Sequence, residues 1–192
     1  MMFERFTDDA RAVVIGATAC AERADASTVT NEHLLLALME VEGARTAFAL
    51  RALGITDRRA SLEAALADAR RRGGMTKADE QALAGLGIDV GAIVARVEET
   101  HGAGALAGDR KDRRWWSGHR SFTREAKQTL EKSLRIALGR RDRSIGAEHI
   151  LLALTAVPGV VSEALADHGA TYATLERAMF GGEADGGTAK AG

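Results

Sequence analysis

An internal repeat is the feature of this sequence that most restricts what the chain can fold into. Residues 6–38 align with residues 122–154 without a gap, and the shared residues fall into two clusters. The first cluster is Phe-Thr-x-x-Ala, and the second is Glu-His-x-Leu-Leu-Ala-Leu, in which six of seven positions are identical. Self-similarity of this kind predicts a structural unit that occurs twice in the fold.

Another part of the unit recurs more loosely, and it occurs three times. Ala49–Ile55 resembles Ala164–Ala170, and the same pattern of Ala, Leu and Gly returns as Ala82–Ile88. The chain is therefore predicted to hold two full repeats with a partial third copy between them. The expected domains are a first repeat over residues 2–72, an insertion and linker over 73–121, a second repeat over 122–180 and a disordered Gly-rich tail over 181–192.

Each unit has the pattern of a small helical bundle. Thr7 and Thr123 precede its first helix, and their hydroxyl groups can cap the free N–H groups there. Apolar residues at spacings of three and four then predict one buried stripe. The stripe consists of Ala10, Val13, Val14, Ala17, Cys20, Ala21 and Ala24 in the first unit, and of Leu130, Leu134, Ala137 and Leu138 in the second. A second helix, which begins near Asn31, is apolar almost all round and is expected to be the central helix of its unit.

Three glycines mark the expected ends of helices. Gly54, Gly87 and Gly169 each follow an Ala- and Leu-containing segment, where a residue in the left-handed conformation commonly ends a helix. A final, weaker helix is expected after each glycine, over residues 61–72, 89–100 and 172–180.

Composition agrees with a helical protein of ordinary size. Of the 192 residues 46% are apolar, while one Pro and only five Phe, two Trp and one Tyr argue against a β-sandwich or barrel. The single Cys20 cannot form an internal disulfide or a Cys-based zinc site, and no secretion signal or membrane span is visible. We expect a cytoplasmic protein with an all-α fold: two pseudo-twofold-related helical repeats in one compact module, with an inserted helical segment between them.

The repeated motifs resemble those of a known family. The N-terminal repeat domain of Clp unfoldases of the ClpC/ClpA type has similar segments, which here are Phe3 to Thr7, Asn31 to Leu38 and Ala147 to Leu154. The resemblance covers residues 2–180 and implies a pseudo-twofold helical module that docks adaptor proteins and presents substrates to an ATPase ring. In some members the domain binds phosphorylated arginine. The chain has no Gly-x4-Gly-Lys-Ser/Thr phosphate loop, so we expect a stand-alone, non-enzymatic protein without cofactors.

Glu32 and Glu148 are the main candidates for a ligand site. Both are expected at the first helical position of equivalent helices, where a carboxylate by itself stabilises the helix by about 0.3–1 kcal/mol. The resemblance assigns them instead to the guanidinium group of phosphoarginine, with helix N-terminal amides left for the phosphate. The same expected site includes Asn31, Thr7 and Thr123. Because Asn31 precedes Glu32 whereas Ala147 precedes Glu148, we expect the first site to be the more competent.

Other residues have a structural and a functional interpretation. His33 and His149 lack a second ligand at helical spacing, so we expect no metal site but a hydrogen bond from each to the adjoining loop. Phe122, like Phe3, lies close to a helix start, where core packing or a hydrophobic staple is the default. The resemblance implies that Phe3, Phe122 and Lys127 receive adaptors and cyclic-peptide antibiotics.

The charge of the chain is unevenly distributed. Residues 110–143 contain 12 Lys or Arg and four Asp or Glu, a local charge of +8, whereas the whole chain carries −1. This basic segment includes Trp115 and Trp116 and can bind an acidic protein surface, pack on its own domain or bind nucleic acid. We rank nucleic acid last because no nucleic-acid-binding motif accompanies the charge.

The sequence therefore predicts a protein-binding module of the Clp proteolysis system. It is expected to recognise substrates or adaptors, with arginine-phosphorylated proteins among them, or to act as a decoy for the ligands of an unfoldase's own domain. The alternative is a nucleic-acid-associated protein that binds through residues 110–143.

Overall fold

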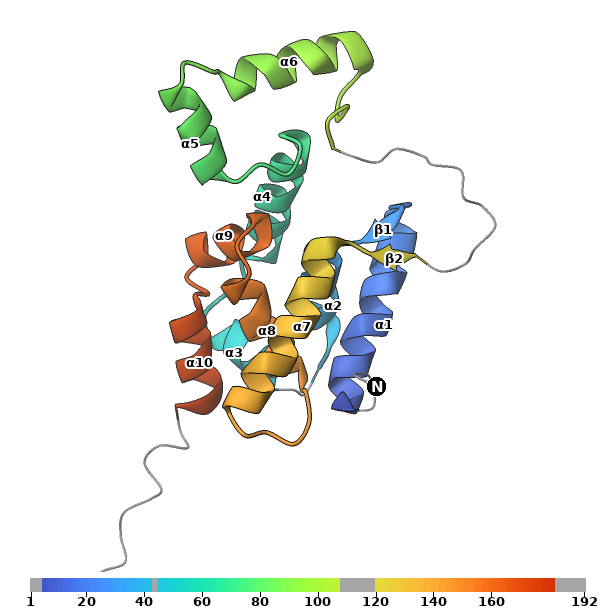
Figure 1. Cartoon of the computed structure of the whole chain (residues 1–192), viewed down its shortest axis with the longest axis vertical. Coiled ribbons are helices and arrows are strands. Elements are labelled where there is room, and N and C mark those ends of the chain that lie inside the picture. The colour runs from blue at the N-terminus through green and yellow to red at the C-terminus, as the bar shows by residue number, and fades with distance from the viewer. Residues whose placement is uncertain (1–4, 43–44, 108–119, 182–192) are drawn as a thin grey trace, which may run out of the picture.

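The computed structural model describes residues 5–42, 45–107 and 120–181, and within these ranges it contains ten helices and one pair of short strands (Figure 1). In chain order the elements are α1 (Asp8–Arg23), β1 (Thr28–Val29), α2 (Asn31–Glu40), α3 (Arg45–Ala52), α4 (Arg59–Arg71), α5 (Lys77–Gly85), α6 (Val90–His101), β2 (Ser121–Phe122), α7 (Arg124–Gly139), α8 (Ala147–Ala156), α9 (Val160–Asp167) and α10 (Tyr172–Phe180). The expected all-α fold is confirmed. Phe3, Trp115, Trp116 and the predicted disordered tail after residue 181 lie outside the described residues.

The repeat is visible as two sets of four helices, α1 to α4 and α7 to α10. In each set the first two helices pack against each other, α1 on α2 and α7 on α8. The two second helices also contact one another, and α8 reaches α1 and α3 of the other set. Their buried leucines make the centre of one shared core: Leu34, Leu35 and Leu38 from α2, and Leu151, Leu152 and Leu154 from α8. The prediction of central second helices is confirmed.

Two short parallel pairings join the repeats, and each pairs the segment before the first helix of one repeat with the segment before the second helix of the other. In β1 and β2, Val29 pairs with Phe122, and the N–H of Thr123 donates to the carbonyl of Val29 at 2.9 Å. In the equivalent pairing, the segment before α1 lies beside the segment before α8, and the N–H of Thr7 donates to the carbonyl of Ile145 at 3.0 Å. The first helix of each repeat therefore begins beside the second helix of the other.

The first helices begin where the sequence predicts. The hydroxyl of Thr7 accepts from the N–H of Ala10, and that of Thr123 accepts from the N–H of Ala126, each at 3.2 Å. Two residues of the predicted stripes are nevertheless exposed. Ala24 lies beyond the end of α1, where the chain turns out of the helix. Leu138, in the last turn of α7, is 53% exposed, because the buried face of that turn is occupied by its neighbours Ile136 and Ala137.

The three predicted glycine stops are confirmed, and all three have the same geometry. Gly54, Gly87 and Gly169 have φ of +67°, +82° and +86°. In each case the following residue donates its N–H to a carbonyl five residues before it, at 2.8 Å, 3.0 Å and 2.8 Å. This is the Schellman arrangement, in which a left-handed residue lets the chain satisfy the last helical carbonyls. The final helices that the sequence predicts follow these turns as α4, α6 and α10.

The inserted α5 and α6 form a hairpin that stands away from the rest of the molecule at the end of α4 (Figure 1). No residue of α5 is buried, and in α6 only Val90 and Val94 are. Across the described residues no single helix is long and apolar enough to cross a bilayer; α8 and α9 reach that length and composition only as a pair bent by 97°.

Candidate functional site

Two histidines define where the central helices start. The Nδ1 atom of His33 accepts from the N–H of Thr30 at 3.0 Å, and that of His149 accepts from the N–H of Gly146 at 2.9 Å. The predicted hydrogen bond from each histidine to its adjoining loop is confirmed. Because these bonds make residues 30 and 146 the N-caps, Glu32 and Glu148 occupy the second helical position; the prediction of the first position was wrong. Within residues 5–42, 45–107 and 120–181, no group of three His, Cys, Asp or Glu side chains is placed to hold a metal ion.

Glu32 lies in a cavity of about 470 Å³ that we call the Glu32 pocket. The N-terminal ends of three helices line it: Asn31 and Glu32 from α2, Thr123 and Glu125 from α7, and residues 159–162 from α9. The first-turn N–H groups of a helix have no partner within the helix, so each of these ends presents donors and a partial positive charge. The convergence depends on the strand exchange, which brings the start of α7 beside the start of α2.

A guanidinium group already occupies one side of the pocket. Nη1 of Arg70, at the end of α4, lies 3.0 Å from Oε1 of Glu32. The Glu32 side chain is 14% exposed and that of Arg70 is 47% exposed, so the ion pair closes the carboxylate off from much of the solvent. Arg70 is not recognisable as a pocket residue from the sequence. It belongs to a run of three arginines, and no local pattern distinguishes it from Arg71, which pairs with Glu98, or Arg72, which pairs with Glu80.

The other predicted residues of the pocket differ in how far their polar atoms are satisfied. The Oδ1 atom of Asn31 is buried and has no hydrogen-bond partner among the described residues. An unsatisfied buried acceptor is costly, so this atom is suited to a donor that enters the pocket. The Thr123 hydroxyl, in contrast, is used as the cap of α7.

Glu148 lies at the equivalent junction of the second repeat, where Thr7 begins α1 beside Ile145. Its side chain is 24% exposed, and Oε1 lies 3.6 Å from Nδ1 of His149. The carboxylate packs against Gly146, in space that a Cβ atom at that position would fill. Among the described residues Glu148 has no arginine partner. The structure thus divides the predicted ligand residues into two sets, with Asn31, Glu32 and Thr123 together and Thr7 near Glu148.

The remaining predicted residues lie at the surface near α7. Phe122 is half-buried in β2 and packs against the core, whereas Lys127 is exposed in the first turn of α7. Within the described part of the basic segment, one arginine makes contacts inside the fold. Arg140 lies over the Phe180 ring, 3.5 Å from its centroid, and pairs with Glu176 at 3.3 Å.

Comparison with known proteins agrees with this architecture. A family model described as the Clp repeat (R) N-terminal domain matches residues 5–81 and 121–185, which include most of both helical repeats. The chain is similar to the crystal structure of the N-terminal domain of the caseinolytic protease associated chaperone ClpD from Arabidopsis thaliana, with 18% identity and a TM-score of 0.53 over 95% of this chain and 97% of that chain. It is also similar to the Hsp104 N-terminal domain from Candida albicans, with 18% identity and a TM-score of 0.53 over 93% of this chain and 91% of that chain. At such identity the solved structures show the fold, and the family match over both repeats shows the kinship. This chain belongs to the family of Clp repeat N-terminal domains.

Proposed function

We propose that the chain is a non-enzymatic protein-binding module of the Clp system, which recognises phosphorylated arginine side chains of substrate or adaptor proteins in the Glu32 pocket. The observation that carries the proposal is the ion pair between Arg70 and Glu32. A guanidinium group of the protein itself lies 3.0 Å from this carboxylate, which supports the same carboxylate as the partner of a guanidinium ligand.

The other polar groups of the pocket support the same ligand. A phosphorylated guanidinium group keeps four of the five N–H donors of arginine, and one of them can satisfy the buried Oδ1 atom of Asn31 beside Glu32. A phosphate on the same side chain needs donors and positive potential, which the N-terminal end of α9 supplies, whereas the end of α7 is capped by Thr123 and brings the Glu125 carboxylate to the pocket. Acceptors for the guanidinium and donors for the phosphate therefore lie in one cavity.

Two further elements of the proposal follow from the pseudo-twofold arrangement. Glu148 and Thr7 form a second, weaker site, because the Glu148 carboxylate is turned against Gly146. Phe122 and Lys127, beside the Glu32 pocket on β2 and α7, receive the adaptor chain or a cyclic-peptide antibiotic. An accessory that delivers ligands and a decoy that withholds them would use the same pocket.

Binding of a labelled peptide that carries one phosphoarginine, followed by fluorescence anisotropy, tests the proposal. Glu32→Ala is expected to weaken binding at least about tenfold, since a charge-assisted hydrogen bond is worth about 1.5–3 kcal/mol. Glu148→Ala is expected to weaken it less. The matched control is Glu131→Ala, which removes an exposed carboxylate on α7 outside the pocket. Unchanged binding of the peptide by the Glu32→Ala protein would contradict the proposal.

A further inference from the structure

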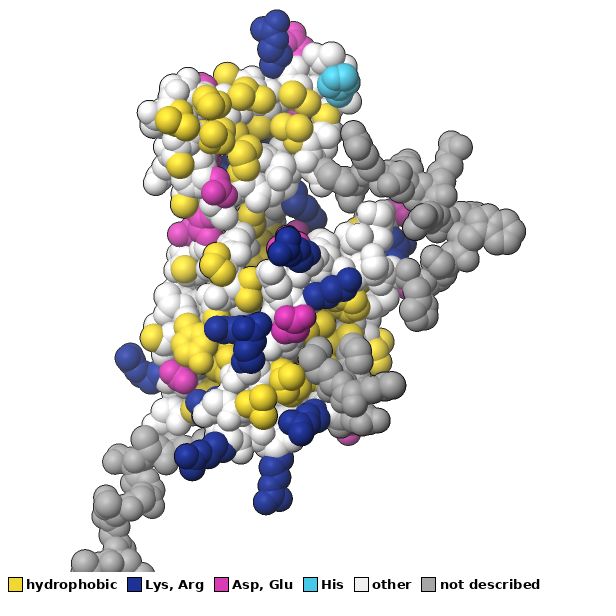
Figure 2. Space-filling model, in the orientation of Figure 1, with side chains coloured by type: hydrophobic (Ala, Val, Ile, Leu, Met, Phe, Trp, Pro, Cys, Tyr) yellow, Lys and Arg dark blue, Asp and Glu magenta, His cyan; other side chains and the backbone are white. Residues whose placement is uncertain are grey.

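The inserted α5–α6 hairpin presents an uncovered apolar face. Leu86, Ile88 and Ile93 are 77%, 38% and 49% exposed. Figure 2 shows hydrophobic side chains gathered over α5 and α6, on the side that faces the viewer. Scattered apolar residues are normal at a protein surface, but a contiguous group on an element with almost no buried residues of its own indicates an interaction surface.

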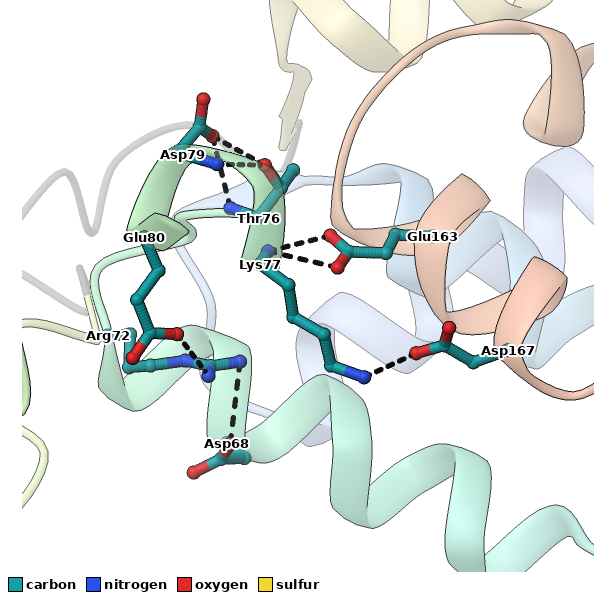
Figure 3. Close-up of polar contacts among 8 residues, drawn as sticks. All are labelled: Asp68, Arg72, Thr76, Lys77, Asp79, Glu80, Glu163 and Asp167. Atoms are coloured by element: carbon teal, nitrogen blue, oxygen red, sulfur yellow. Dashed lines mark hydrogen bonds and ion pairs between the residues drawn. The ribbon is translucent and has the colours of Figure 1, made fainter. Parts of the chain in front are cut away.

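Polar contacts hold the hairpin to the molecule and leave this face free. The N–H of Lys77 donates to both carboxylate oxygens of Glu163 at 2.9 Å, and its Nζ lies 2.5 Å from Asp167, so the start of α5 is tied to α9 (Figure 3). At the other end of the hairpin, Arg71 donates two hydrogen bonds to Glu98, at 2.9 and 2.6 Å. The hairpin is thereby fixed in place while Leu86, Ile88 and Ile93 stay exposed.

The sequence repeat shows what this face corresponds to. Ala82–Ile88 repeats the segments that connect α3 to α4 and α9 to α10, with the same Schellman turn. At the position of Ile88 those hairpins have Ile55 and Ala170, which are both fully buried. Five residues further on, Leu175 of α10 is fully buried, whereas its counterpart Ile93 is half exposed. The third hairpin therefore exposes the Ile88 position, which both relatives bury, and the Ile93 position, which α10 buries; the counterparts of Leu86 are half-buried.

The two related hairpins pack on each other as well as on the shared core. Helix α3 packs on α10, and α4 packs on α9. The start of each helix meets the end of its partner. The guanidinium of Arg45, in the first turn of α3, lies 5.6 Å from the centroid of the Phe180 ring at the end of α10. Arg58, just before α4, donates to the carbonyl of His168, just after α9, at 2.8 Å. Hairpins of this type thus cover one another in a twofold manner.

We infer that the α5–α6 hairpin pairs with the same hairpin of a second copy of this chain, α5 against α6 of the other copy and the reverse. Transfer of the pairing seen within the chain places Leu86, at the end of α5, beside the first turns of the other α6, where Ile93 lies. The apolar residues of the face therefore meet their own equivalents in the second copy, as an isologous dimer requires.

Sedimentation equilibrium of the full chain at concentrations up to about 0.1 mM tests the inference. The expected species has twice the 20.3 kDa mass of the chain. Leu86→Asp and Ile93→Asp should each weaken the dimer at least about tenfold, because a charge would be buried without a partner. Both positions are exposed in the single chain, so circular dichroism of the variants should stay unchanged. Ile15→Asp, at a 70% exposed position on α1, is the matched control and should leave the dimer intact.

Disulfide trapping tests the orientation. A mixture of Leu86→Cys and Ile93→Cys chains should form a mixed disulfide faster than either chain forms one with itself, and the wild-type chain, with its buried Cys20, should form none. A wild-type chain that stays at 20.3 kDa throughout, or a Leu86→Asp chain that remains a dimer, would overturn the inference. So would equal dissociation by Ile15→Asp.

Discussion

Replacement of Arg70 with Ala is expected to strengthen the binding of a guanidinium ligand to the Glu32 pocket by about two- to fivefold. In the unliganded protein Arg70 lies on the Glu32 carboxylate, so an incoming guanidinium must first displace it. Arg70 is 47% exposed, which makes the ion pair a partly solvated one, worth about 0.5–1 kcal/mol. Since about 1.4 kcal/mol corresponds to a tenfold change in affinity, removal of this competitor gives the stated factor.

The assay is a titration with N-acetylarginine amide, followed by NMR through the backbone amides of α2. All variants are made in the Glu148→Ala protein, so that the measured binding comes from the Glu32 pocket alone. Arg70→Lys should give an intermediate affinity, because a lysine keeps the charge but lacks the planar fork that matches a carboxylate. The matched control is Arg59→Ala, which removes another α4 arginine that pairs with Glu63 at 2.7 Å, away from the pocket. Binding that is unchanged or weaker in Arg70→Ala would refute the competition.

Three further predictions concern the stability of the parts that position these surfaces. The hydrogen bonds from Arg71, with one from the N–H of Gly104, lower the pKa of Glu98 to about 2 from its ordinary value of 4.5. A carboxyl group with a lowered pKa in the folded state stabilises above its ordinary pKa and ceases to do so as the pH falls towards 2. Amide hydrogen exchange in residues 77–101 should therefore become faster, relative to exchange in α8, as the pH falls from 4.5 to 2. In the Glu98→Gln protein, exchange in these residues should already be fast at neutral pH. The control variant Glu99→Gln should exchange like the unchanged protein. Gly169→Ala should cost about 1–2 kcal/mol of unfolding free energy in urea, because its φ of +86° strains an L-residue while no atom lies within 4 Å of the new Cβ; a cost near zero would contradict a strained left-handed turn. Leu151→Ala, at the fully buried centre of α8, should cost about 2–5 kcal/mol and lower the stability of both repeats together, and separate transitions for the two repeats would argue against a shared core.

Local chemistry made much of the fold predictable from the sequence. The caps at Thr7 and Thr123, the glycine turns and the His33 hydrogen bond all join residues within a few positions of one another, so sequence spacing is sufficient to recognise them. The two glutamates were expected one position too early, because the cap lies at residue 30, whose N–H bonds to the histidine three residues further on. Ala24 and Leu138 were misjudged because an apolar pattern does not show where the last turn of a helix leaves the core.

The sequence by itself thus determined the repeated helical unit, its third partial copy and the two candidate glutamates. Only the tertiary structure decided that Glu32, Asn31 and Thr123 share one pocket and that Arg70 and not its neighbours reaches it. It also decided which of three similar hairpins keeps its apolar face uncovered. The physical reason is the same in each case. These outcomes depend on which distant segments lie beside a residue, and a local sequence pattern is identical whether or not a partner covers it.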